Sequence, residues 1–125
     1  MRSIATGIDL VEIRRLEAID PAIKTRFLKR VFTDRELDEC AGKDIRLAAR
    51  FAAKEAAAKA LGCGIGKVSW QELEILTEAN GRPVLRFHGE ASRLASDLGW
   101  SDWSVSLSHT SEYAVASVTA LLESV

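Results

Sequence analysis

The spacing of hydrophobic and polar residues changes several times along the chain, and each change predicts a new secondary-structure element. Residues 3–9 alternate between the two kinds, which predicts a short strand with Asp9 at its end. From Leu10 the apolar residues recur at helical spacing, so we expect a helix that ends near Pro21. A further helical segment is expected around residues 23–28.

The middle of the chain has two clear helix signals. Thr33 followed by Glu36 is a capping-box pattern, which predicts a short helix that runs toward Cys40. A long helix is predicted from Lys43 to Leu61. The glycines that follow it are typical of a helix C-terminus.

The last third alternates again. Strands are predicted at residues 68–77 and 84–87, joined by the hairpin signal Asn80-Gly81. A helix over residues 90–98 is expected to end at Gly99. Two final strands are expected, and their ranges are 103–109 and 113–120. This order of elements predicts one α+β domain over residues 1–125, with a long helix packed on a largely antiparallel sheet.

The long helix is rich in alanine and carries Glu55 and Lys59 four residues apart, hence on one face. The simplest interpretation is an intrahelical ion pair worth about 0.2–0.5 kcal/mol. However, the eight alanines between positions 48 and 60 make the helix thin, so a sheet or a ligand can approach it closely. A carboxylate buried there would need a cation beyond an exposed lysine.

Asp9 allows two interpretations. It can cap the helix expected to begin at Leu10, since aspartate is a good N-cap residue. It can also join Glu55 in a Mg²⁺ site, because such sites use one or two carboxylates and complete their coordination with phosphate and water. Lys59 would then contact the phosphates as a point charge.

A serine-rich segment near the C-terminus ends in His109 and Thr110. The two residues can simply cap the turn that follows a half-buried strand. They can also donate hydrogen bonds to a ligand from the end of that strand.

The net charge of the chain and its distribution bear on which kind of partner the protein binds. The net charge is -1, which gives no reason to expect a nucleic-acid partner. Residues 10–30 are nevertheless locally basic, with six basic and three acidic residues. Such a surface can be merely solvated, or it can attract an acidic protein. The four arginines in this segment are Arg14, Arg15, Arg26 and Arg30.

Other features point to a cytoplasmic protein. The cysteines, Cys40 and Cys63, lack the spacing of metal ligands and are expected to be free thiols. The N-terminal apolar run is interrupted by charged residues, so it does not resemble a signal peptide. No stretch has the roughly 20 apolar residues that a transmembrane helix needs, so we expect no membrane association.

Four blocks of sequence carry a resemblance to a known family. They are GIDLVEIRRLE at 7–17, RFAAKEAAAKALGCGIG at 50–66, NGRPVL at 80–85 and SLSHTSEYAVASV at 106–118. In this order they resemble the holo-[acyl-carrier-protein] synthases, the small single-domain group of 4′-phosphopantetheinyl transferases. G-I-D followed by K-E-A-x-x-K is specific as a combination, although neither half is sufficient alone. The resemblance implies the phosphopantetheinyl transferase fold.

The resemblance also implies an activity, namely Mg²⁺-dependent transfer of phosphopantetheine from coenzyme A to a serine of apo acyl carrier protein, in support of fatty acid biosynthesis. Asp9 and Glu55 match the magnesium ligands of the family, and with Lys59 they form the expected catalytic set. Coenzyme A is expected to contact Lys59, His109, Thr110 and the glycine turn at Gly62. The basic arginines are expected to dock the acidic carrier protein.

The family is typically trimeric, with active sites where subunits meet, so a homotrimer is expected. The main alternative is a non-catalytic coenzyme A or nucleotide-binding domain, which would not need both Asp9 and Glu55. A second alternative is a purely structural oligomer. The sequence leaves open which carrier protein is modified, whether acyl-coenzyme A is accepted, and whether Glu55, a metal-bound water or His109 takes the serine proton.

Overall fold

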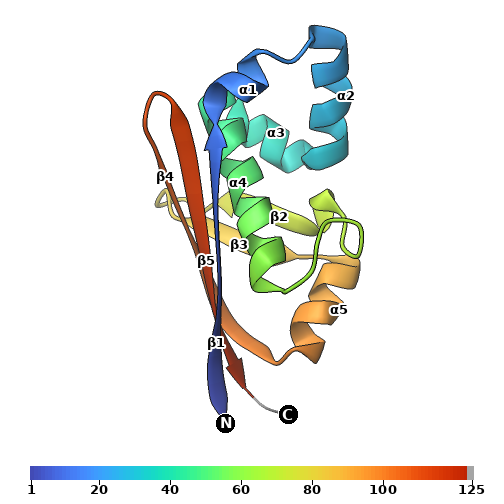
Figure 1. Ribbon diagram of the computed structural model, residues 1–125, viewed down its shortest axis with the longest axis vertical. Helices are drawn as coiled ribbons and strands as arrows, with labels where there is room; N and C mark the ends of the chain where they lie inside the picture. Colours follow the sequence, from blue (N-terminus) through green and yellow to red (C-terminus); the bar gives the residue numbers. More distant parts are fainter. Residues whose placement is uncertain (124–125) are drawn as a thin grey trace.

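A three-stranded antiparallel sheet and one long helix form the centre of the molecule (Figure 1). The computed structural model describes residues 1–123. The central strand β5 (Tyr113–Glu123) lies between β1 (Arg2–Glu12) and β4 (Trp100–His109). Helix α4 (Asp44–Ala60) packs along one face of this sheet.

A second, two-stranded sheet lies on the other side of α4 (Figure 1). Its strands, β2 (Leu73–Thr77) and β3 (Pro83–Phe87), form an antiparallel hairpin. Gly81 in the turn has a φ of 88°, which suits glycine and confirms the predicted hairpin signal. The single-turn helix η1 (Trp70–Glu72) precedes β2, and α5 (Gly89–Asp97) follows β3.

Three shorter helices surround the N-terminal end of α4. They are α1 (Ile13–Glu17), α2 (Pro21–Val31) and α3 (Asp34–Cys40). The predicted capping box is present at α3, where Thr33 and Glu36 each bond the backbone of the other. Asp20 caps α2, accepting from the backbone nitrogen of Ala22 at 3.0 Å. Within residues 1–123, none of the helices combines the length and apolar character needed to cross a membrane.

The prediction of an α+β fold is confirmed, but several predicted boundaries were wrong, most notably at the end of the first strand and in the strand before the hairpin. Strand β1 does not end at Asp9. It pairs with β5 as far as Glu12, opposite Tyr113. The helix expected from Leu10 therefore begins at Ile13, and Glu12 occupies its N-cap position. Asp9 is thus no helix cap, because it lies within a continuous antiparallel ladder.

The strand predicted over residues 68–77 is also shorter than expected. Only Leu73–Thr77 is extended, because η1 occupies Trp70–Glu72. Ser69 caps this turn through its side chain, and Glu72 accepts from the Ser69 nitrogen at 2.8 Å. Residues 73–76 are all buried, because β2 packs against both α3 and α4.

The end of α4 is set by glycine, as predicted. Gly62 has a φ of 73°, in the left-handed region. Its backbone nitrogen donates to the Lys59 carbonyl at 3.0 Å, and the Cys63 nitrogen donates to the Ala58 carbonyl at 3.1 Å. These two bonds form a Schellman motif, which satisfies carbonyls that the helix end would leave free.

Lys54 is the main feature of α4 that the sequence did not reveal. Its side chain is fully buried, and Nζ donates to Glu36 Oε1 at 2.7 Å. It also donates to the carbonyls of Trp70 at 3.0 Å and Leu73 at 2.8 Å. Glu36 Oε2 in turn accepts from the Ile75 nitrogen at 2.9 Å. Burial lowers the pKa of Lys54, and the Glu36 carboxylate opposes that shift.

We predict that Lys54→Met lowers the free energy of unfolding by about 3–5 kcal/mol, because Glu36 would remain buried without its cation. Urea denaturation of the purified variant measures this change. Lys43→Met is the control. Lys43 is exposed and makes no side-chain cap bond, so about 0.5 kcal/mol or less is expected. A similar small loss for Lys54→Met would show that the pair does not fix α4.

Candidate active site

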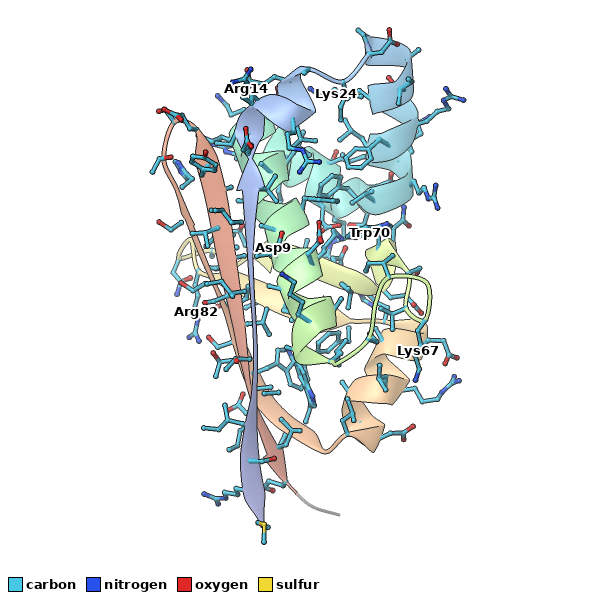
Figure 2. The ribbon with its side chains drawn as sticks, viewed as in Figure 1. Asp9, Arg14, Lys24, Lys67, Trp70 and Arg82 are labelled. Carbon is cyan, nitrogen blue, oxygen red and sulfur yellow. The ribbon has the colours of Figure 1, made fainter. Side chains whose placement is uncertain are left out.

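Asp9 lies on the side of β1 that faces α4, and its side chain is only 14% exposed (Figure 2). Lys59 Nζ, from the last turn of α4, donates to Asp9 Oδ1 at 3.1 Å and to the Ile8 carbonyl at 3.0 Å. The Lys59 side chain is 56% exposed. The structure therefore places a strand carboxylate and a largely solvated ammonium group side by side.

The expected pairing of Lys59 with Glu55 was wrong. Among residues 1–123, no ion pair joins the two, and Lys59 pairs with Asp9 instead. Helical spacing places both side chains on one face, but the neighbouring strand offers Lys59 a carboxylate and a carbonyl together. The Lys59 side chain is largely solvated whereas Asp9 is largely buried, so Lys59 can turn to a ligand when another cation takes its place beside Asp9.

The carboxylate of Glu55 lies near the charges of Asp9 and Lys59. Burial raises its pKa above the ordinary value, and the nearby negative charge of Asp9 raises it further. The positive charges of Lys59 and Arg15 act in the opposite direction. Asp9 and Glu55 line the same groove, which is why the two carboxylates repel each other.

A groove of about 470 Å³ opens beside these two carboxylates. Asp9, Glu55 and Arg15 supply its polar lining. Its apolar lining comes from β1, α1, the loop after α1, α2 and α4. The apolar residues are Leu10, Val11, Leu16, Ile19, Phe27 and Phe51. The groove thus places a charged site next to an apolar surface.

The aromatic part of the groove is well supported. The rings of Phe27 and Phe51 have centroids 5.6 Å apart, and Phe51 stacks on Trp70 at 5.0 Å. Sequence reasoning did not find this wall, although Phe27 falls in a predicted helix. Phe51 and Trp70 join it only because α4 and η1 pack together.

The donors at this site fit a hard divalent cation. Mg²⁺ binds one or two carboxylates and completes its octahedron with water and substrate phosphate. Asp9 and Glu55 provide that number of carboxylates. Within residues 1–123, no group of three or more His, Cys, Asp or Glu side chains is arranged to hold a metal. The site therefore suits a cation shared with a phosphate ligand, and not a closed structural metal site.

The basic segment lies next to the groove. Arg14, Arg15, Arg26 and Arg30 are all exposed, on α1 and α2. Lys24 differs, because its Nζ lies 2.6 Å from Asp44 Oδ1 in a partly buried ion pair. The arginines remain available to a partner.

The other predicted ligand-binding residues lie apart. His109 and Thr110 are exposed at the β4–β5 turn, beside α1 (Figure 1). Thr110 Oγ1 accepts from the backbone nitrogens of Glu112 at 3.2 Å and Tyr113 at 3.0 Å, so it shapes the turn. Gly62 is at the opposite end of α4 (Figure 1). Within one chain, the structure brings Asp9, Glu55 and Lys59 together, with Gly62 directly after the Lys59 turn, but keeps His109 and Thr110 at the other end of α4.

Comparison with known proteins agrees with this geometry. Residues 5–118 match the model of the 4′-phosphopantetheinyl transferase superfamily. The chain belongs to this family. It is 48% identical to the holo-[acyl-carrier-protein] synthase of Moorella thermoacetica, over 97% of this chain and 94% of that protein. It is 43% identical to that of Herpetosiphon aurantiacus, over 94% of this chain and 98% of that protein.

Solved structures of the family confirm the fold. The Helicobacter pylori holo-[acyl-carrier-protein] synthase in complex with coenzyme A matches with a TM-score of 0.83 and 32% identity, covering 92% of this chain and 98% of that one. The Neisseria meningitidis protein matches with a TM-score of 0.83 and 36% identity, covering 93% and 96%. The resemblance predicted from four sequence blocks is therefore confirmed, and with it membership of a transferase family.

We predict that Glu55→Gln makes the metal-free protein more stable at neutral pH. Because folding raises the pKa of Glu55, its protonated form favours the native state, and this contribution is lost as pH rises through the raised pKa. Glutamine resembles the protonated form at every pH. The gain in Tm should therefore grow as pH rises through the raised pKa and shrink toward pH 4.5, the ordinary pKa of the group.

Thermal unfolding with a chelator present, from pH 4.5 to 8, measures the effect. Glu17→Gln, on the exposed surface of α1, is the matched control for the loss of one carboxylate and should change Tm little. A lower Tm for Glu55→Gln than for the wild type at neutral pH would show that burial and repulsion from Asp9 do not destabilise the ionised Glu55.

Proposed function

We propose that the protein transfers the 4′-phosphopantetheine group of coenzyme A to a serine hydroxyl of an apo acyl carrier protein, in the cytoplasm and in support of fatty acid biosynthesis. The serine oxygen forms a bond to the pantetheine-linked phosphorus, and adenosine 3′,5′-bisphosphate leaves. The observation that carries this proposal is the convergence of Asp9, Glu55 and Arg15 on one groove with an apolar wall. The similarity to holo-[acyl-carrier-protein] synthases over nearly the whole chain supports it.

Asp9 and Glu55 would hold Mg²⁺, which supplies positive charge for the pyrophosphate and the leaving phosphate. Phosphoryl transfer of this kind depends mainly on positioning and electrostatic stabilisation. Lys59 can release Asp9 and turn toward the phosphates, since it is largely solvated. Arg15 lines the groove on the side of the basic segment, where the carrier protein would dock.

The serine proton needs an acceptor near the groove. Glu55 is one candidate, because its carboxylate lines the groove where the serine would enter. A water held by one of the two carboxylates is the other candidate. His109 is less suited, because within one chain it lies at the β4–β5 turn and does not line the groove.

The carrier protein would approach from the side of α1 and α2. Exposed arginines there attract an acidic surface, which raises the association rate and weakens with salt. The apolar wall formed by Phe27, Phe51 and their neighbours would then bury apolar residues next to the acceptor serine.

Coenzyme A would bind between subunits of a homotrimer. Strand β1 exposes a row of large apolar side chains on the sheet face opposite α4, with Ile4 69%, Ile8 63% and Leu10 62% exposed. Such a row is typical of a surface covered by another chain. A neighbouring copy on this face can bring its own β4–β5 turn to the groove, so that His109 and Thr110 of one subunit meet Lys59 and Gly62 of another.

We expect the wild-type protein, mixed with coenzyme A, Mg²⁺ and apo acyl carrier protein, to add one phosphopantetheine to the carrier, detected by mass spectrometry of the intact protein. Asp9→Ala and Glu55→Gln should lower the rate by at least about 100-fold while remaining folded, because removing one group that stabilises transition-state charge costs that much. A folded Asp9→Ala variant with full activity would contradict the proposed metal site.

Arg15→Glu tests the docking surface. We expect it to raise the KM for carrier protein more than the KM for coenzyme A, by about tenfold or more if one charge–charge contact of about 1.4 kcal/mol is lost. Steady-state assays with each substrate varied in turn give both constants. Arg86→Glu, an equal change of charge at the exposed residue of β3, is the control and should alter neither constant. Equal increases in both constants for Arg15→Glu would argue against a docking role.

A further inference from the structure

The separation of Asp9 and Glu55 depends on how closely two elements pack, since one residue belongs to β1 and the other to α4. Gly7 lies two residues before Asp9 on the same face of β1. Ala56 follows Glu55 directly in α4. The contact between Gly7 and Ala56 therefore lies beside the two carboxylates.

Gly7 lets the strand and the helix approach unusually closely. A Cβ atom placed on Gly7 would lie 1.9 Å from the Ala56 carbonyl oxygen and 2.8 Å from the Ala60 nitrogen. Carbon atoms in contact are normally about 3.5–4.0 Å from their neighbours. Both atoms belong to the helix backbone, so no side-chain rotation can relieve the overlap.

Conformation does not explain the glycine. Gly7 is part of the extended strand β1, and its φ is not among the positive values found at other glycines. Any residue can adopt that backbone. What excludes a side chain at position 7 is the space between β1 and α4. The fully buried side chains of Ala53, Ala56 and Ala57 keep the helix equally thin.

We infer that Gly7 is a positioning residue for the divalent cation: the close contact of β1 with α4 at Gly7 sets the separation of Asp9 and Glu55, and so favours a small ion over a larger one. The inference rests on the proposed function, which assigns the cation to these two carboxylates. Gly7 has no side chain to bind the ion, so its effect is transmitted through the two elements that carry the ligands.

Comparing ions of different size separates an effect on the cation site from a general effect on folding. Mg²⁺ needs oxygen ligands at about 2.0–2.1 Å in a nearly ideal octahedron, whereas Ca²⁺ takes more flexible arrangements at about 2.3–2.6 Å. A side chain at position 7 must move α4 away from β1, which widens the site. The widened site should lose Mg²⁺ more than Ca²⁺, whereas a general loss of stability would weaken both alike.

Three variants separate these effects. Gly7→Ala adds one carbon directly at the contact. Ala56→Ser is a milder change that adds one atom on the helix side, at a fully buried residue. Gly99→Ala is the control for strain elsewhere in the fold. A Cβ there would also overlap the backbone, 2.2 Å from the Glu123 carbonyl oxygen, and the φ of 85° at Gly99 adds strain of its own. Gly99 directly precedes β4, at the opposite end of the sheet from the β4–β5 turn.

The measurement is direct metal binding, without turnover. Each protein is mixed with coenzyme A and Mn²⁺, without carrier protein, and free Mn²⁺ is followed by electron paramagnetic resonance while Mg²⁺ or Ca²⁺ displaces it. We expect Gly7→Ala to bind Mg²⁺ about tenfold more weakly, similar to the loss of other supporting contacts of metal ligands. Its preference for Mg²⁺ over Ca²⁺ should fall, with a smaller shift in Ala56→Ser and none in Gly99→Ala.

Every outcome bears on the inference. An unchanged Mg²⁺-to-Ca²⁺ preference in folded Gly7→Ala overturns it. If circular dichroism shows that Gly7→Ala does not fold, Ala56→Ser decides, by shifting the preference or leaving it unchanged. A shift of equal size in Gly99→Ala also overturns it. If the wild-type protein binds no Mn²⁺, the metal assignment of the proposed function fails first, and the inference fails with it.

Discussion

The close packing of β1 against α4 is the contact on which the rest of the structure depends. It is possible because Gly7 has no side chain and because the sheet-facing side of the helix is alanine. On the other side of α4, the buried Lys54 ties the helix to Glu36 and to the carbonyls before β2. The helix is thus held on two sides. Glu55 and Lys59 lie on the part of its surface that neither contact covers, close to Asp9.

Three charged residues within six positions of α4 therefore have different tasks. Lys54 is buried and structural, Lys59 is exposed and bonded to β1, and Glu55 lies between them at the groove. Their angular positions explain the division, because neighbouring residues on a helix point about 100° apart. The pKa of Glu55 is raised because folding buries this second carboxylate and places it beside Asp9.

The sequence was sufficient for the elements with strong local signals. The capping box at Thr33, the hairpin at Asn80-Gly81 and the glycine end of α4 depend on a few neighbouring residues. The end of β1 was not predictable in this way, because the three residues after Asp9 are held by pairing with β5, over a hundred residues later. Lys54 and Lys59 could not be told apart either, since burial depends on distant elements. The pairing of Asp9 with Glu55 was one of two interpretations that the residues allowed, and the family resemblance then favoured it over a helix cap.

The central claim is that Asp9 and Glu55 jointly hold a divalent cation at the phosphates of coenzyme A. The most direct test is a crystal structure of the protein grown with coenzyme A and Mn²⁺, with diffraction data collected at the manganese absorption edge. The account predicts an anomalous peak within coordination distance of both carboxylates and of a pyrophosphate oxygen. Coenzyme A bound in the groove with the manganese peak elsewhere would contradict it.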